Sequence, residues 1–169
     1  MKVVLTTLNA KYIHKNLALR WLYVSRIPEA DVELMEFVIK DDLEQISDQI
    51  ALRKPEVIGI SVYIWNARQT RAWIAILKRK LPQVRILIGG PEVSYECAAW
   101  LDTGIEAVLR GEGEKTFWQA VRGDRDIDGY VSHDYISPVA YARVDLNWLE
   151  TLGSPYWLAM DADSMAHRY

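Results

Sequence analysis

The stretch VRILIGG, residues Val84–Gly90, decides the fold class of this chain. Its β-branched, apolar part shows no alternation, which is typical of a parallel strand covered on both faces. Only the run Val32–Val38 alternates, because Glu33 and Glu36 interrupt it, and we expect that strand near the sheet edge. Similar runs recur along the chain, and the expected strands are Val3–Leu8, Val32–Val38, Val57–Val62, Val84–Ile88 and Ala107–Leu109.

Segments with helical spacing separate these runs. A last helix is expected to begin near Glu114, with Asp41 or Asp42 capping the second helix and Asn66 the third. Strict alternation with short loops requires parallel strands and right-handed crossovers. The pattern therefore predicts a doubly wound α/β fold, with a five-stranded sheet between two layers of helices. The helical spacing is carried by Leu17, Trp21 and Val24, by Leu43, Ile46 and Ile50, and by Thr70, Trp73, Leu77 and Leu81.

The regular pattern stops after Gly123. From there to Pro138 the chain is rich in Asp, Gly and Ser, and no strand or helix period holds. The segment Val144–Tyr156 then adds apolar side chains that have no partner in the alternating unit. We expect an α/β domain over residues 1–123 and a linker or irregular tail over residues 124–169.

The composition excludes several classes of protein. A net charge of −3 over 169 residues gives no reason to expect a nucleic acid or a membrane surface as partner. The single Cys97 rules out an internal disulfide, fits a reducing cytosol and cannot build a zinc or iron–sulfur site alone. No apolar run approaches the roughly 20 residues of a membrane span, and no signal peptide opens the chain. We expect a soluble, cytoplasmic protein.

The loops that follow the strands are where a ligand is expected. In open parallel sheets, ligands bind outside the carboxyl ends of the strands. Gly89 and Gly90 follow one strand directly, and Gly111 and Gly113 follow its neighbour. Missing Cβ atoms there would let a bulky ligand lie against the backbone, but glycines at such turns also serve simply to adopt positive φ. Both explanations remain open at this point.

Several familiar sites are absent from these loops. The first loop contains no glycine, so no dinucleotide fingerprint follows the first strand, and no P-loop motif occurs. Thr6 and Thr7 are not followed by a flavodoxin-type phosphate loop, and Ser61 stands where a phospho-receiver domain needs Asp. The nucleotide, FMN and phosphoacceptor interpretations are weakened together.

The chain resembles the N-terminal cobalamin-binding domains of B12-dependent radical S-adenosylmethionine (SAM) proteins. The motifs that carry the resemblance are IGISVY (Ile58–Tyr63), IGGPEVS (Ile88–Ser94), RGEGEKTF (Arg110–Phe117) and the late DL…SPY stretch (Asp145–Tyr156). The resemblance implies a flavodoxin-like (Rossmann-like) fold that holds cobalamin at the carboxyl ends of the strands. It also implies a C-terminal radical SAM barrel as partner, with S-adenosylmethionine and a [4Fe–4S] cluster that this chain does not bind. Methyl transfer is one reaction of that family, and this chain alone would be non-catalytic.

The same resemblance implies roles for individual residues. Ser61 would contact the benzimidazole base of the cofactor's tail, and Gly89 with Gly90 would make room for that nucleotide tail. Tyr12, Tyr63 and Trp65 lie on loops that would frame the exposed upper face of the corrin, with packing in the core as the alternative role. The full expected cofactor-binding set is Asn9, Lys11, Tyr12, His14, Ser61, Tyr63, Gly89, Gly90, Pro91, Glu92, Gly111, Glu112 and Gly113.

The first loop departs from the family pattern. Many cobalamin domains carry D-x-H-x-x-G there, and aligned on this chain the motif falls on residues 9–14, with Lys11 in place of the His that ligates cobalt. A lysine ammonium group makes a poor cobalt ligand. The resulting hypothesis is that cobalamin binds with its tail base detached and no protein nitrogen on the lower face. His14 is the remaining candidate ligand, with a capping or surface role as its alternative.

Two other functions stay open on sequence grounds. One is a cofactor-free α/β interaction module, whose tail residues Trp148, Tyr156 and Trp157 would anchor a partner domain. The other is an FMN-binding flavodoxin-like domain.

Overall fold

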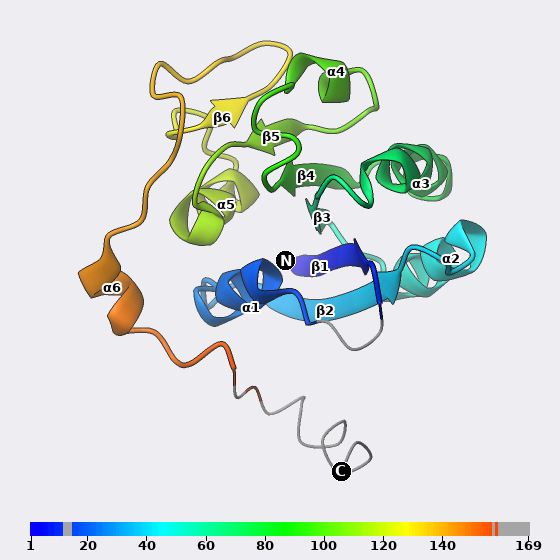
Figure 1. The fold of residues 1–169 in the computed structure, drawn as a ribbon, viewed down its shortest axis with the longest axis horizontal. Helices are drawn as coiled ribbons and strands as arrows, with labels where there is room; N and C mark the ends of the chain where they lie inside the picture. Colours follow the sequence, from blue (N-terminus) through cyan, green and yellow to red (C-terminus); the bar gives the residue numbers. More distant parts are fainter. Residues whose placement is uncertain (12–14, 157, 159–169) are drawn as a thin grey trace.

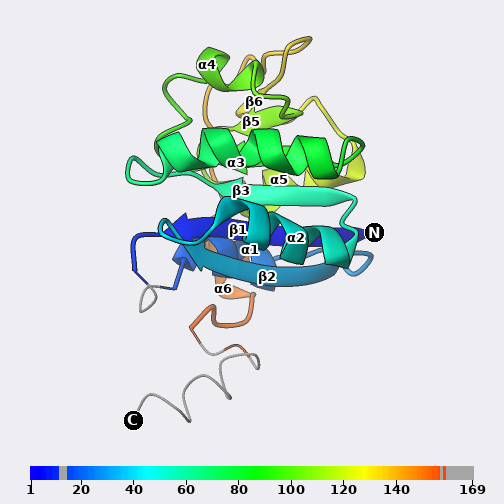
Figure 2. The ribbon, with the colours of Figure 1, turned by 90° about the vertical axis from the view of Figure 1, so that its right-hand side faces the viewer.

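A six-stranded sheet forms the centre of the molecule, which we describe from a computed structural model for residues 1–11, 15–156 and 158. The strand order is β2-β1-β3-β4-β5-β6, and β1 to β5 run parallel (Figures 1 and 2). All the predicted strands are confirmed, and the alternating strand β2 lies at the sheet edge as expected. The strands are β1 (Lys2–Asn9), β2 (Asp31–Val38), β3 (Val57–Ser61), β4 (Arg85–Gly89), β5 (Ala107–Leu109) and β6 (Tyr130–Val131).

Helices cover both faces of this sheet. Figure 1 shows α1 and α5 on one face and α2 and α3 on the other, which confirms the predicted three-layer, doubly wound arrangement. The helices are α1 (Leu17–Val24), α2 (Leu43–Arg53), α3 (Ala67–Lys80), α4 (Ala98–Leu101), α5 (Gly113–Arg122) and α6 (Leu146–Glu150).

Successive residues of each strand supply two separate cores. On β1, Val4 and Leu8 belong to the cluster that contains Trp73 of α3, whereas Val3 and Leu5 belong to the cluster that contains Phe117 of α5. Neighbouring strand residues point to opposite faces, so a strand that feeds two cores must be apolar throughout. This explains why VRILIGG and its equivalents lack alternation.

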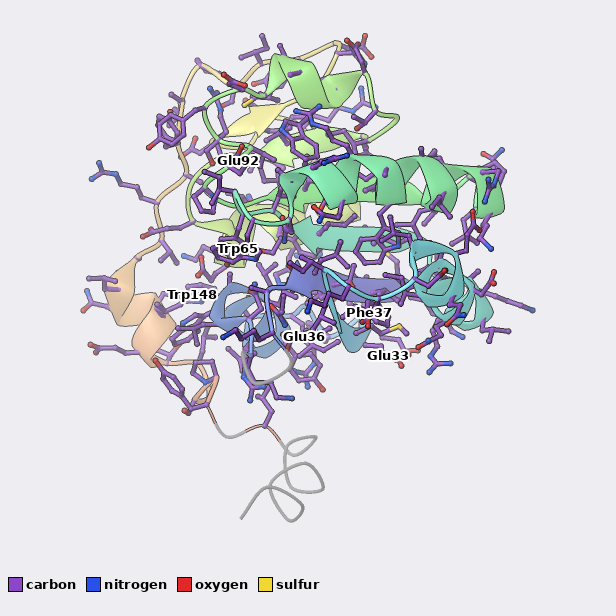
Figure 3. The ribbon with its side chains drawn as sticks, turned by 45° about the vertical axis from the view of Figure 1, so that its right-hand side comes forward. Glu33, Glu36, Phe37, Trp65, Glu92 and Trp148 are labelled. Carbon is purple, nitrogen blue, oxygen red and sulfur yellow. The ribbon has the colours of Figure 1, made fainter. Side chains whose placement is uncertain are left out.

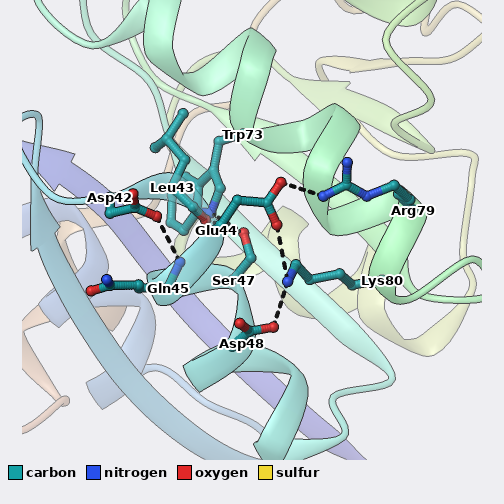
Figure 4. Close-up of polar contacts among 9 residues, drawn as sticks. All are labelled: Asp42, Leu43, Glu44, Gln45, Ser47, Asp48, Trp73, Arg79 and Lys80. Carbon is teal, nitrogen blue, oxygen red and sulfur yellow. Dashed lines mark hydrogen bonds and ion pairs between the residues drawn. The ribbon is translucent and has the colours of Figure 1, made fainter.

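The outer layer of α2 and α3 is joined by an ion-pair network (Figure 4). Glu44 of α2 accepts hydrogen bonds from Arg79 and lies 3.0 Å from the Lys80 ammonium, which is also 2.5 Å from Asp48. Glu44, Asp48 and Arg79 are exposed to solvent, so these ion pairs contribute little to stability. Below the network, the buried indole of Trp73 donates to the Ser47 hydroxyl at 3.0 Å. Packing of that indole, more than the surface charges, fixes the two helices together.

The structure distinguishes between the predicted helix caps. Asp42 caps α2, because its carboxylate accepts from the Gln45 amide at 3.0 Å, while Asp41 accepts from the Val38 amide instead. Asn66 occupies the N-cap position of α3 as predicted, but its side chain makes no capping bond to the helix. Asn66 is turned back into the protein, where its Nδ2 donates to the Leu8 carbonyl at 3.0 Å.

The segment after α5 contains regular structure that the sequence did not predict. Tyr130 and Val131 form β6, which pairs antiparallel with β5, so the sheet has six strands instead of the expected five. Further along, Ala142 bridges to Gly111 through the bonds of its amide and carbonyl to the loop after β5. A two-residue strand is too short to show a period, which is why this segment looked irregular. The division between residues 1–123 and 124–169 stays a prediction.

In the part of the chain that the structure describes, no helix combines the length and apolar character needed to cross a bilayer.

Candidate functional site

A pocket of about 440 Å³ opens at the carboxyl ends of β3, β4 and β5, between the sheet and helices α1 and α5. Its sheet side includes Ile60, Ser61 and Leu87, and its helix side includes Leu19 and Phe117. A volume of this size lies within the range usual for cofactor sites, and such sites are typically apolar with a few polar groups. The pocket therefore has the place and the lining that the strand-end argument required.

Most of the predicted site residues come together at this pocket. Asn9, Lys11 and Glu92 do not line it, while Tyr12 and His14 lie outside the described residues. The predicted residues that do line the pocket are Ser61, Tyr63, Gly89, Gly90, Pro91, Gly111, Glu112 and Gly113.

The glycines at the strand ends serve different purposes. A Cβ on Gly90 would lie 2.3 Å from the Val62 carbonyl oxygen, and its φ is +115°. Gly111 has a φ of +91°, and a Cβ on it would lie 2.3 Å from the Ala142 carbonyl oxygen. At both positions the backbone itself excludes a side chain, so no ligand is needed to explain the glycine. Gly89 and Gly113 have no positive φ and line the pocket, so the missing side chains of these two glycines leave room there.

Ser61 combines a held backbone with an available hydroxyl. Its carbonyl oxygen accepts from the Thr7 hydroxyl at 2.8 Å and from Asn66 Nδ2 at 3.4 Å. Among the described residues, its own hydroxyl has no hydrogen-bond partner, although the residue is only 7% exposed. Ser61 therefore brings to the pocket lining a backbone that is held in place and a hydroxyl group that can donate or accept a hydrogen bond.

Asn9 has a role inside the protein that the sequence did not indicate. Its Nδ2 donates to Glu36 Oε2 at 2.7 Å, and the same oxygen accepts from the Asn16 amide at 2.8 Å. Asn16 in turn caps α1 through the Leu19 amide at 3.0 Å and reaches the Tyr63 hydroxyl at 3.3 Å. Glu36 thus links the end of β1 to the start of α1. Sequence reasoning missed it, because Glu36 was noted only as a polar interruption of an edge strand.

Glu114 is a pocket residue that the predicted set did not include. It lies in the first turn of α5 and lines the pocket, and its Oε2 is buried with no hydrogen-bond partner among the described residues. Burial raises the pKa of this carboxyl above its ordinary value, and the neighbouring Glu112 carboxylate raises it further. Glu114 is the second glutamate of the motif RGEGE, and the predicted set included only the first, Glu112.

Aromatic side chains lie at the pocket, since Tyr63, Tyr95 and Tyr141 belong to its lining. Tyr63 and Trp65 stack with ring centroids 4.4 Å apart and planes inclined by 7°, and Trp65 is 46% exposed. Tyr95 and Tyr141, from the loops after β4 and β6, form a second pair with centroids 6.4 Å apart. Figure 3 shows Trp65 and Glu92 at this same edge of the sheet. We call the four aromatic residues the aromatic rim.

The segment that contains α6 runs past the pocket. Among the described residues, two hydrogen bonds and one cation–π contact hold it against the domain. The Val144 amide donates to Glu112 at 2.6 Å, and the Lys115 ammonium lies 4.4 Å from the centre of the Trp148 ring. At the far end, the buried Arg20 of α1 donates to the Pro155 carbonyl oxygen at 2.7 Å. Figure 1 shows this segment on the side of the molecule that carries α1 and α5.

The charges of the pocket limit what it can hold. The only charged side chains in its described lining are Glu112 and Glu114, with no Lys, Arg or His beside them. Such a lining disfavours a deeply inserted phosphate. Nor do residues 1–11, 15–156 and 158 contain any group of three or more His, Cys, Asp or Glu that could hold a metal ion. The geometry suits a flat, mostly apolar group with a few hydroxyl or amide donors.

Comparison with known proteins identifies the family and the fold. Residues 3–121 of this chain match the sequence model of a protein family that is described as B12 binding domain. The cobalamin-dependent radical SAM methyltransferase TokK of Streptomyces tokunonensis is 27% identical over 77 residues, which cover 44% of this chain and 11% of TokK.

Solved structures with the same fold cover more of the chain. The cobalamin-dependent S-adenosylmethionine radical enzyme OxsB, with aqua-cobalamin and S-adenosylmethionine bound, matches 85% of this chain with a TM-score of 0.68 and 16% identity. A cobalamin-binding protein from Desulfitobacterium hafniense DCB-2 matches 72% of this chain and 57% of its own, with a TM-score of 0.56 and 18% identity. This chain spans only 22% of OxsB, so it corresponds to a small part of that protein's length.

Proposed function

This chain belongs to the B12-binding domain family, and on that premise we propose that it holds cobalamin for a radical SAM enzyme. The observation that carries the proposal is the pocket at the carboxyl ends of β3, β4 and β5, which lies where this fold class binds its ligands. The chain would act as the cofactor-holding part and would not turn over substrate alone.

The residues of the pocket fit the nucleotide arm of cobalamin. Gly89 leaves space beside the sheet, and Leu19 and Leu22 offer an aliphatic wall for the benzimidazole ring. The Ser61 hydroxyl is available to the ring nitrogen, since within the described residues it bonds to nothing else. When bound, cobalamin would supply a cobalt ion able to carry a methyl group or an electron, while the protein orients the cofactor and excludes water.

The lower face of the cobalt is proposed to lack a protein nitrogen. Lys11 occupies the position of the family's ligand His, and its side chain is exposed in the structure. We expect the cobalt(II) form of the complex to show no nitrogen superhyperfine splitting in its EPR spectrum. Splitting would contradict this part of the proposal, and its loss in His14→Ala would identify His14 as the donor.

The catalytic part of the enzyme is proposed to be a separate radical SAM barrel. In this scheme residues 1–123 form the cobalamin-binding unit. Residues 124–169 form a linker that leads to the barrel. The barrel would carry the [4Fe–4S] cluster and S-adenosylmethionine, for which the single Cys97 here provides no site. It would approach cobalamin from the side of the aromatic rim. A lone free cysteine also fits the cytoplasm as the proposed location.

Gel filtration after incubation with hydroxocobalamin tests the proposal directly. We expect a red protein peak with about one cobalamin per chain, and a colourless peak from Gly89→Leu, whose side chain would occupy the pocket. A colourless wild-type peak would overturn the proposal and favour the cofactor-free interaction module. Protein that is yellow as purified would instead indicate FMN.

A further inference from the structure

Residues 142–156, which we call the strap, cross from α5 to α1 on the face of the sheet that carries both helices (Figure 1). At the start of the strap, Ala142 is buried and pairs with Gly111 in a parallel bridge. Near its end, Pro155 is buried and its carbonyl oxygen accepts a hydrogen bond from Arg20 Nε at 2.7 Å. Buried groups therefore hold the strap at both ends, and the domain fixes its course.

The strap contacts the same elements that wall the pocket. Its Val144 amide donates to the Glu112 carboxylate at 2.6 Å, and Glu112 belongs to the pocket lining. Tyr141, the residue directly before the strap, also lines the pocket. On the other side, Arg20 follows Leu19 in α1, and Leu19 lines the pocket as well. A ligand in the pocket and the docked strap would therefore act on the same loop and the same two helices.

The strap supplies a second link between α1 and α5. The first link is direct, because the Trp118 indole of α5 donates to the Leu22 carbonyl oxygen at 3.0 Å and to the Ser25 hydroxyl at 3.2 Å. Ser25 ends α1, so this link lies away from the start of the helix. The second link runs through the strap, from Lys115 in the first turn of α5 to Arg20 of α1. Docking of the strap thus opposes separation of the two helices beside the pocket.

We propose that the strap is a clamp on the pocket, so that cobalamin binding and docking of the strap stabilise each other. The inference rests on the proposed function and adds a conformational coupling to it. The pocket of about 440 Å³ is present while the strap is docked, so a ligand of the pocket would select this state. Such coupling is reciprocal, and cobalamin therefore holds the strap in place by the same factor by which the docked strap tightens cobalamin binding.

Limited proteolysis with and without saturating hydroxocobalamin tests one direction of the coupling. With a protease of broad specificity and mass spectrometry, we expect cobalamin to slow cleavage within residues 146–156 at least about fivefold, the lower end of typical coupling between sites. Cleavage at the exposed residues 122–126 is the internal control and should change less than about twofold, because local openings of separate segments are independent. In Gly89→Leu, whose pocket is filled, hydroxocobalamin should slow neither cleavage.

Titration calorimetry with hydroxocobalamin tests the other direction. Arg20→Met removes the donor to Pro155 and keeps a buried aliphatic chain, while Trp148→Ala removes the ring beneath Lys115 without touching the pocket. The double variant should bind hydroxocobalamin at least about threefold more weakly than wild type, and by no more than the protection factor from proteolysis. Arg26→Met is the matched control and should bind as wild type does, because Arg26 is exposed and bonds to the Tyr23 carbonyl oxygen. Circular dichroism verifies that each variant is folded.

Other outcomes separate this inference from the proposed function. Wild-type protein that does not bind hydroxocobalamin overturns both. Wild-type protein that binds it while cleavage of the strap stays unchanged overturns only the clamp. A double variant that binds as tightly as wild type also overturns the clamp, since reciprocity requires a loss. Weakening beyond the protection factor does so too, because the substitutions would then act on the pocket directly and not through the strap.

Discussion

At the scale of single residues, adjacent glycines have different physical explanations. Gly90 has a φ of +115° and a neighbouring carbonyl oxygen where a Cβ would lie, whereas the nearest atom to a Cβ on Gly89 is the Leu109 oxygen at 3.2 Å. The sequence placed both at a strand end but could not separate them. The distinction depends on backbone φ and on a neighbouring strand that is remote in sequence.

This difference predicts unequal costs of substitution. Gly90→Ala should lower the free energy of unfolding by about 3 kcal/mol or more, because strained φ and a backbone clash add together. Gly89→Ala should cost about 1 kcal/mol, since the neighbouring backbone must give way only slightly. Urea unfolding of the two variants measures both values, and equal losses would contradict this assignment.

Glu36 is a residue whose importance depends on partners from other elements. Glu36→Ala should destabilise the protein by about 1–3 kcal/mol, because Asn9 Nδ2 and the Asn16 amide both lose the oxygen that pairs them. Glu33→Ala is the control on the same strand (Figure 3), where an exposed pair with Arg53 is worth less than about 1 kcal/mol. Urea unfolding compares them, and a Glu33→Ala loss as large as that of Glu36→Ala would argue against the proposed linkage.

Glu114 also predicts a dependence of stability on pH. Because its pKa is raised in the folded protein, the folded state holds this proton more tightly than the unfolded state does. The stability contributed by the neutral carboxyl is complete below the ordinary value of 4.5 and is lost as pH rises through the raised pKa. Unfolding free energies of wild type and Glu114→Gln, measured without ligand from pH 4 upward, should therefore diverge in favour of Glu114→Gln. Curves that stay parallel would show that Glu114 does not titrate abnormally.

At the scale of secondary structure, the sequence predicted the elements whose burial imposes a long pattern. The parallel strands β1, β3, β4 and β5 are largely apolar because they feed two cores, and α2 and α3 show helical spacing because each buries one side. β6 has two residues and depends on its pairing with β5, so no local pattern marks it. The meeting of Ser61, Gly89 and Gly113 followed from parallel strand ends, but Glu36 and Glu114 required contacts between elements.

The segment carrying α6 is predicted to be held by Arg20. Arg20→Ala removes the donor to the Pro155 carbonyl oxygen, so residues 146–156 should detach from α1 more often. We expect limited proteolysis in this segment, followed by mass spectrometry, to be about fivefold faster, as loss of about 1 kcal/mol of hydrogen bonding implies. Arg26→Ala, an exposed arginine just beyond the same helix, should leave cleavage unchanged. Unchanged cleavage in Arg20→Ala would mean that the contacts with Glu112 and Lys115 hold the segment without Arg20.

At the scale of the whole molecule, cobalamin binding and folding are linked. A ligand that binds only the folded state adds about 2.7 kcal/mol to the free energy of unfolding when present at 100 times its Kd. For a chain of 169 residues this corresponds to a rise in Tm of about 5–11 °C. We expect that rise with hydroxocobalamin in differential scanning calorimetry, and none in Gly89→Leu, whose pocket is filled. FMN should leave the Tm of both proteins unchanged, because a lining that contains Glu112 and Glu114 and no cation repels the doubly charged phosphate monoester of FMN more strongly than the singly charged phosphodiester of cobalamin's arm. A rise with FMN equal to that with hydroxocobalamin would contradict the selectivity that these two carboxylates impose.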